Sequence, residues 1–274
     1  MVTPLTLATW SFAGRRGPFG GALDGADVER SFHELGIRSF LVTPKMKALA
    51  EGVRRLIRVG HRDEITLISL AGIPTPGRVR GYWRRFARAL ETERMDVFLM
   101  GWVQHPWYLR RAVWHQMQQL KAEGKVSALG FSIHNRPLAG RLANELEPRP
   151  DVLMVRYNAA HRGAESDIFD RLPTPRPGII AYTATRWGEL LQPRPDQGYE
   201  RGLSAPDCYR FTLSHPAVDS VMCAARTWEE LREDVEAVEE GALSEERLRE
   251  VRRFGDAVHA RPRIRGSRFT FDRR

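Results

Sequence analysis

The chain has 274 residues, of which 42% are hydrophobic, and a formal net charge of +9. This length and apolar content are typical of one large folded domain and exclude a disordered chain or a small disulfide-rich protein. Only two cysteines occur, Cys208 and Cys223, without metal-binding spacing, which indicates a reducing, cytoplasmic setting. No apolar run reaches the roughly 20 residues of a membrane span, and the N-terminus lacks a secretory signal pattern.

The positive charge comes mostly from arginine, which is spread over all the predicted helices and concentrated in the segment 261–274. No aromatic side chains alternate with basic ones to form a nucleic-acid platform. The composition therefore argues against nucleic acid as the main partner. It gives no indication of the oligomeric state.

Short apolar runs alternate along the chain with stretches that have helical spacing of apolar residues. The predicted strands are residues 5–12, 39–43, 65–70, 96–103, 126–131, 152–155, 178–182 and 218–223. The predicted helices are residues 27–35, 45–59, 76–93, 108–123, 137–146, 205–213, 227–238 and 245–260. A loop with proline and glycine spans 186–203, and loops of this length are usually functional or disordered.

The stretch 124–165 sets the architecture, because it reads strand, helix, strand with no hairpin turn between the strands. Eight such strands alternating with helices predict a single (β/α)8 TIM barrel over residues 1–260, followed by a basic tail over 261–274. The polar clusters SIHN (132–135) and RYNAAHR (156–162) then follow strand ends. In parallel α/β folds that edge is where ligands bind.

Five segments, in the correct order, resemble motifs of the aldo-keto reductase family. GKVSALGFS resembles GKIRxIGVSN, DVLMVRYN resembles xxxQxxYN, and LGIRSFLVT resembles LGINFFDTA. GIIAYTATRWGEL resembles GIIAYSPLGRGLL, and VMCAARTWEELREDV resembles VIPGARTPEQLEEN. The resemblance implies a TIM barrel that binds NADPH in extended form and reduces carbonyl compounds.

The family's catalytic Asp, Tyr, Lys and His are not found at the matching positions. The resemblance places the aspartate at Val42, the tyrosine near Lys47, the lysine at Ser69 or Leu70, and the histidine at Gly101. A general acid is typically worth 10²- to 10⁴-fold in rate. The sequence therefore predicts either a non-standard mechanism or no redox chemistry.

The resemblance assigns part of a nicotinamide site. Ser132 matches a serine that holds the nicotinamide amide, whereas Ile133 and Met154 replace an asparagine and a glutamine. Tyr157 matches the tyrosine that stacks on the nicotinamide ring, and Tyr182 is also assigned to the cofactor. The choice between NADP, NAD and no dinucleotide stays open, with NADP favoured.

The resemblance also assigns the adenosine end of the cofactor. Arg226 matches a basic residue near the 2′-phosphate, where its charge suits that group. Glu230 and Asp234 stand where a glutamine and an asparagine are expected. Their negative charges are expected to weaken binding beside a phosphate.

Four residues past strand ends are candidates for catalysis. His105, His134 and His161 can act as acid or base near neutral pH, and Arg162 can hold a carboxylate or phosphate. The alternative is that His161 and Arg162, with Glu165, form a structural loop network. The three histidines on one face also allow a metal site, but their spacing does not argue for one, and no metal is predicted.

Other side chains near the predicted ligand edge have two interpretations each. Arginines of the first loop can hold an anion, lysines of the second loop can act as acids, and tryptophans can line an aromatic pocket. Each can instead be solvated or packed. These residues are Arg15, Arg16, Lys45, Lys47, Trp10, Trp102, Trp107 and Trp187.

Three functions follow from these observations. The first is an NADP-binding oxidoreductase that uses His105, His134 or His161 in place of the missing acid. The second is a catalytically inactive binding or regulatory protein that keeps the barrel. The third is a non-redox lyase or isomerase for an anionic substrate held by Arg15, Arg16 and Arg162.

Overall fold

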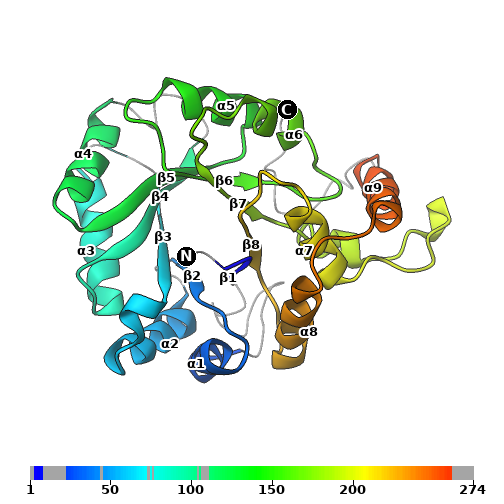
Figure 1. Ribbon diagram of the computed structural model, residues 1–274, viewed down its shortest axis with the longest axis horizontal. Helices are drawn as coiled ribbons and strands as arrows, with labels where there is room; N and C mark the ends of the chain where they lie inside the picture. Colours follow the sequence, from blue (N-terminus) through cyan, green and yellow to red (C-terminus); the bar gives the residue numbers. More distant parts are fainter. Residues whose placement is uncertain are drawn as a thin grey trace.

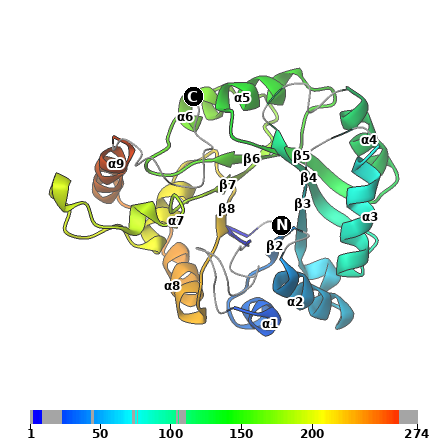
Figure 2. The same ribbon diagram turned by 180° about the vertical axis from the view of Figure 1, so that it is seen from behind.

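Eight parallel strands form a closed barrel in the chain order β1 to β8, as Figures 1 and 2 show from opposite sides. The computed structural model describes residues 3–8, 23–43, 46–72, 75, 77–103, 105 and 111–260. Strand β1 pairs with both β2 and β8, which closes the barrel. Helices surround the barrel on the outside. The predicted (β/α)8 TIM barrel is therefore confirmed.

The strands are β1 (Leu5–Leu7), β2 (Ser39–Val42), β3 (Thr66–Ala71), β4 (Met95–Val103), β5 (Val126–Ile133), β6 (Val152–Arg156), β7 (Gly178–Tyr182) and β8 (Ser220–Cys223). The helices are α1 (Gly25–Glu34), α2 (Lys47–Arg58), α3 (Val79–Leu90), α4 (Arg111–Ala122), α5 (Arg136–Glu145), α6 (Ala164–Asp167), α7 (Ala205–Leu213), α8 (Trp228–Glu239) and α9 (Glu245–His259). Short 3₁₀ helices are η2 (His61–Glu64), η4 (Phe169–Arg171), η5 (Glu189–Leu191) and η6 (Pro195–Gln197).

Three of the differences between the predicted and the observed elements have a clear physical reason. The helix predicted from residue 76 begins only at Val79, because Gly77 has a φ of +83°, which a helix does not use. Strand β5 extends to Ile133, where it still pairs with both β4 and β6. Between β6 and β7 the sequence indicated no helix, and the structure places the single-turn α6 there.

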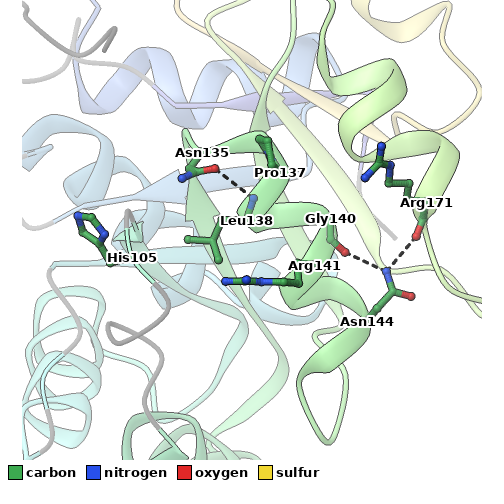
Figure 3. Close-up of a pocket in the computed structure, with 8 residues that line it drawn as sticks. All are labelled: His105, Asn135, Pro137, Leu138, Gly140, Arg141, Asn144 and Arg171. Carbon is green, nitrogen blue, oxygen red and sulfur yellow. Dashed lines mark hydrogen bonds between the residues drawn. The ribbon is translucent and has the colours of Figure 1, made fainter. Parts of the chain in front are cut away.

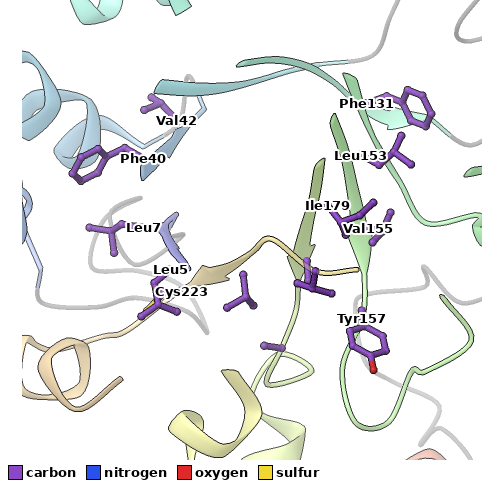
Figure 4. Close-up of a cluster of buried hydrophobic side chains, with 14 of the residues drawn as sticks. Leu5, Leu7, Phe40, Val42, Phe131, Leu153, Val155, Tyr157, Ile179 and Cys223 are labelled. Atoms are coloured by element: carbon purple, nitrogen blue, oxygen red, sulfur yellow. The ribbon is translucent and has the colours of Figure 1, made fainter. Parts of the chain in front are cut away.

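The strands bury both of their faces, as parallel strands between helices do. Every second side chain of a strand points into the barrel, and these side chains form one interior cluster that includes Tyr182. The others pack outward against the helices, and Figure 4 shows several of them. The inner cluster consists of Ala8, Leu41, Ile68, Leu70, Val97, Leu99, Met154, Ile180 and Tyr182.

Helix α9 lies outside the ring of barrel helices, beside α7 (Figure 1). It packs closely on the loop after β6, because a Cβ at Gly255 would meet the carbonyl oxygen of Ala159. We expect Gly255→Ala to lower the free energy of unfolding by about 1–3 kcal/mol, since the loop and helix must separate. Urea denaturation measures this change.

Gly81 in α3 is the matched control, because a Cβ there meets nothing within 4 Å. Both substitutions improve helix propensity, and only the one at Gly255 creates a clash. Gly81→Ala is therefore expected to raise stability by about 0.5–1 kcal/mol. Equal effects of the two substitutions would show that α9 is not held by this close approach.

Candidate active site at the barrel mouth

The carboxyl ends of the strands form the mouth of the barrel, where ligands bind in this fold. Side chains alternate along each strand, and Met154 and Ile180 point into the barrel. Residues two positions further along have the same orientation, which brings Ser132 of β5, Arg156 of β6 and Tyr182 of β7 to the inner rim. All three are buried. Three buried polar side chains of the mouth therefore lie on the neighbouring strands β5, β6 and β7.

His134 follows β5 and meets Tyr182 at this rim. The two rings lie edge to face, with centroids 5.2 Å apart. The Tyr182 hydroxyl donates a hydrogen bond to the carbonyl oxygen of Ile133 at 3.0 Å. Burial raises the pKa of this hydroxyl above its ordinary value, although nearby Arg156 acts to lower it. Tyr182 is therefore neutral and engaged, and the imidazole of His134 lies half-buried beside it.

The opposite side of the mouth has no acid at the positions that the resemblance assigns to one. Val42 points outward into the outer core, so the inward residue at the end of β2 is Thr43. Leu70 occupies the inner end of β3. At Gly101 a Cβ would lie 2.5 Å from the carbonyl oxygen of Ala71, so no side chain fits without a shift. Lys47 begins α2 and is exposed.

Two tryptophans at the mouth have backbone conformations that are rare for bulky residues. Trp102 in β4 has a φ of +55°, next to a shift in the strand register, and is 38% exposed. Trp187 after β7 has a φ of +53° and is 39% exposed. Strain of this kind is concentrated at functional sites, which supports this edge as the ligand site.

The loops after β6 and β7 are joined by a buried asparagine. Asn158 donates a hydrogen bond from Nδ2 to the carbonyl oxygen of Thr183 at 2.7 Å. Its Oδ1 accepts from the backbone N–H of Ala160 at 3.0 Å and of His161 at 2.9 Å. Thr183 has a φ of +59°, and this hydrogen bond helps to hold that conformation. Asn158 therefore ties the segment that follows Tyr182 to the loop after β6.

Tyr157 does not lie among the groups at the inner rim, in contrast to its predicted role beside nicotinamide. It is 1% exposed and belongs to the outer core (Figure 4), where Phe169 and Phe211 surround its ring. Its hydroxyl donates to Glu165 at 2.7 Å, and burial raises the pKa of the hydroxyl. Strand alternation explains this placement, because Tyr157 is one residue beyond the inward-facing Arg156.

His161, Arg162 and Glu165 form the structural loop network that was the alternative to a catalytic group. Arg162 donates to the carbonyl oxygen of Ala159 at 2.5 Å and to Asp256 of α9 at 2.6 Å. Glu165 accepts from Arg252 of α9 at 2.9 Å. Burial acts to raise the pKa of Glu165, but the hydrogen bonds outweigh it and the pKa is lowered.

His161 itself is buried and packs edge to face on His259 of α9, with ring centroids 5.3 Å apart. These contacts direct the His161–Glu165 segment toward α9 rather than into the barrel. These contacts favour a structural role for His161 and Arg162 over catalysis or anion binding. They attach α9 to the loop after β6.

Arg226 and Glu230 lie together at the start of α8. Thr227 caps the helix by accepting from the backbone N–H of Glu230 at 3.2 Å. Glu230 accepts from the Arg226 backbone N–H at 2.7 Å and from its guanidinium at 3.1 Å. The Arg226 side chain is 65% exposed, so an incoming phosphate can compete with Glu230 for it.

Asp234, in contrast, is turned into the core. It is 2% exposed, and its Oδ2 lies 3.6 Å from the Cys223 sulfur. Burial raises its pKa to about 8. The carboxyl group is therefore mostly uncharged at neutral pH. This burial argues against the expected repulsion of a phosphate by Asp234, whereas Glu230 stays beside Arg226.

His105 is exposed and borders a different cavity, of about 580 Å³, on the flank of α5 (Figure 3). The cavity is also lined by Asn135, Leu138, Arg141 and Arg171. Arg141 extends from α5 toward the side where His105 lies. His134 is not among the residues that line this cavity.

Several predicted residues lie outside the described part of the chain. They are Trp10, Arg15, Arg16, Lys45, Trp107 and the segment 261–274. Among the described residues, no three metal-binding side chains come together, so His105, His134 and His161 do not form a metal site. None of the helices in the described ranges is long and apolar enough to cross a membrane.

Comparison with known protein families gives a match to part of this chain. Residues 75–200 match the sequence model of the Aldo/keto reductase family. No curated protein sequence matches the chain.

Solved structures share the fold at low identity. An aldo-keto reductase of Bacillus halodurans in its holo form is 17% identical with a TM-score of 0.74, covering 93% of both chains. An aldo/keto reductase of Klebsiella pneumoniae, in complex with NADP and acetate, is 19% identical with a TM-score of 0.72, covering 93% of this chain and 92% of its own. The aldose reductase of Schistosoma japonicum is 17% identical with a TM-score of 0.69, covering 92% and 88%.

The resemblance to the aldo-keto reductase family is therefore confirmed, by the family match over residues 75–200 and by a barrel with the fold of its solved members.

Proposed function

We propose that the protein is an NADP(H)-dependent oxidoreductase of a small molecule, with His134 as the proton donor in place of the family's usual acid. The observation that carries this proposal is the placement of His134 beside Tyr182 at the inner rim, two residues after the buried Ser132. The solved Klebsiella pneumoniae relative in complex with NADP supports the choice of cofactor.

The residues at the two ends of the assigned cofactor site fit a dinucleotide. Ser132 offers a hydroxyl for the nicotinamide amide, and Tyr182 offers a fixed ring at the rim. At the other end, Arg226 has an exposed guanidinium beside the N-terminus of α8, where positive charge and helix dipole favour phosphate. The buried Asp234 does not oppose this charge.

In this proposal, different residues of the chain have different roles in a carbonyl reduction. The bound cofactor supplies the hydride. His134 donates a proton to the oxygen of the substrate during reduction and accepts it during oxidation. Tyr182 holds the imidazole through its edge-to-face contact, and Ile133 fixes Tyr182 through its carbonyl oxygen. The apolar residues Leu70 and Leu99 below exclude water from the interior.

A turnover assay tests this proposal. The purified protein is incubated with NADPH and a panel of aldehydes and ketones, and NADPH loss is followed by absorbance. Turnover of at least one carbonyl compound is the expected result. A protein that binds NADPH and turns over no compound in either direction would favour an inactive barrel.

The Arg226–Glu230 pair gives a prediction about cofactor choice. Arg226→Ala is expected to weaken NADPH binding roughly 10- to 100-fold, because a charged hydrogen bond to the 2′-phosphate is lost. Glu230→Gln is expected to tighten NADPH binding, since it releases the guanidinium held at 3.1 Å. Fluorescence titration measures both. Equal changes for NADPH and NADH would contradict the assignment of Arg226 to the 2′-phosphate.

A second candidate function is a non-catalytic binding protein, and Gly101 favours it. The close approach of its backbone to Ala71 leaves no space for a histidine there. Leu70, at the inner end of β3, likewise offers no charge. The non-redox lyase or isomerase loses part of its support, because Arg162 is engaged with α9.

A further inference from the structure

A buried arginine at the inner rim has no role in the resemblance or in the chemistry above. Arg156 is the last residue of β6 and is 6% exposed. Met154, two residues earlier, belongs to the interior cluster, and Val152, four residues earlier, packs against it. Strand alternation therefore directs Arg156 into the mouth. Of the buried arginine and aspartate side chains in the described ranges, it is the one that lies on a barrel strand.

Arg156 lies at the level of the proposed proton donor. It pairs in register with Tyr182 of β7, and its charge acts on the Tyr182 hydroxyl. On its other side, Ile133 of β5 pairs with Val155, so His134 and Arg156 follow one another across neighbouring strands. A small ligand at the mouth can therefore reach both side chains.

The chemistry of a buried guanidinium selects its ligand. It carries five N–H donors in a planar fork, which matches the two oxygens of a carboxylate. Its charge acts strongly here because apolar residues such as Leu70 and Leu99 form the base of the mouth and lower the local dielectric. A carboxylate is both attracted and oriented by this charge, whereas a neutral substrate gains neither effect.

We infer that the substrate is a small carbonyl compound or alcohol that carries a carboxylate, held by Arg156 so that its reacting oxygen lies at His134. This inference rests on the proposed oxidoreductase function for the reacting oxygen. The carboxylate site itself is tested separately from turnover.

Two matched aldehydes test the inference through turnover with NADPH. They are 4-carboxybenzaldehyde and its neutral ester, methyl 4-formylbenzoate. The wild type is expected to prefer the acid roughly 10- to 100-fold in kcat/KM, and Arg156→Gln to remove that preference. Arg156→Lys keeps the charge without the planar fork and is expected to retain a smaller preference. Arg141→Gln removes an equal charge from the exposed flank of α5 and is expected to change nothing.

Binding of benzoate, followed by tryptophan fluorescence without cofactor, separates the inference from the proposed function. Benzoate binding that exceeds benzamide binding, and that Arg156→Gln abolishes, supports the carboxylate site even if no aldehyde is reduced. Reduction of both aldehydes at equal kcat/KM overturns the inference while the oxidoreductase proposal stands. Stronger binding of inorganic phosphate than of benzoate overturns the carboxylate assignment. If Arg156→Gln does not fold, the wild-type preference and Arg156→Lys decide.

Discussion

His134→Gln is expected to lower kcat by about 10²- to 10⁴-fold, the usual worth of a general acid. Glutamine keeps much of the imidazole's size and polarity but cannot donate a proton to a developing alkoxide. The affinity for NADPH is expected to stay the same, because the proposed cofactor contacts are Ser132, Tyr182 and Arg226. Steady-state kinetics with a turned-over carbonyl compound, together with fluorescence titration of NADPH, measure the two quantities.

His105→Gln is the matched control for this prediction. His105 is exposed on the α5 flank, so its replacement is expected to leave kcat unchanged. If His105→Gln lowers kcat and His134→Gln does not, the proton donor has been assigned to the wrong strand end.

Asp234→Asn is expected to change how the stability of the protein depends on pH. The carboxyl group is buried beside Cys223, and burial raises its pKa from 3.8 to about 8. Between these values the folded state binds a proton that the unfolded state releases. By linkage, the contribution of Asp234 to stability is therefore fully present below about pH 4 and is lost as the pH rises to about 8.

The loss amounts to about 1 kcal/mol for each pH unit between roughly pH 5 and pH 8. Asparagine does not titrate, so the variant should become progressively more stable than the wild type across this range. Urea denaturation at several pH values measures the difference. Glu236→Gln, on the exposed face of the same helix, is expected to give a difference independent of pH. Parallel curves for wild type and Asp234→Asn would show that the carboxyl group is ionised and solvated.

The fold was predictable because apolar runs and helical spacing report burial directly. The strand predicted at 178–182 and the helix predicted at 205–213 have the same bounds in the structure. Gly77 shows what the pattern misses, since its positive φ delays α3 by three residues relative to the predicted start. A helix start depends on a local backbone angle that apolar spacing does not encode.

The candidate site was less predictable, because the direction of a side chain decides its role. Tyr157 and Arg156 are neighbours in the sequence, yet one packs outward and the other faces the mouth. The two-residue alternation that starts at Met154 could have predicted that Arg156 faces the mouth and that Tyr157 packs outward. Asp234 required tertiary contacts, because only the fold reveals that its carboxyl group lies against Cys223.

The roles of His161 and Arg162 also depended on an element distant in the sequence. Their partners His259 and Asp256 are on α9, more than 90 residues further along the chain. The sequence pattern therefore predicted correctly that this polar cluster lies at the end of a strand. It did not predict whether the cluster faces a ligand or another helix.

A fluorescence titration of the purified protein with NADPH and NADH tests whether this barrel binds NADP(H) at its mouth. The tryptophans of the chain supply the signal. NADPH is expected to bind with a Kd of about 10 μM or tighter, about −7 kcal/mol, and more tightly than NADH. No binding of either nucleotide at millimolar concentration would contradict the oxidoreductase assignment and leave the non-catalytic barrel as the better description.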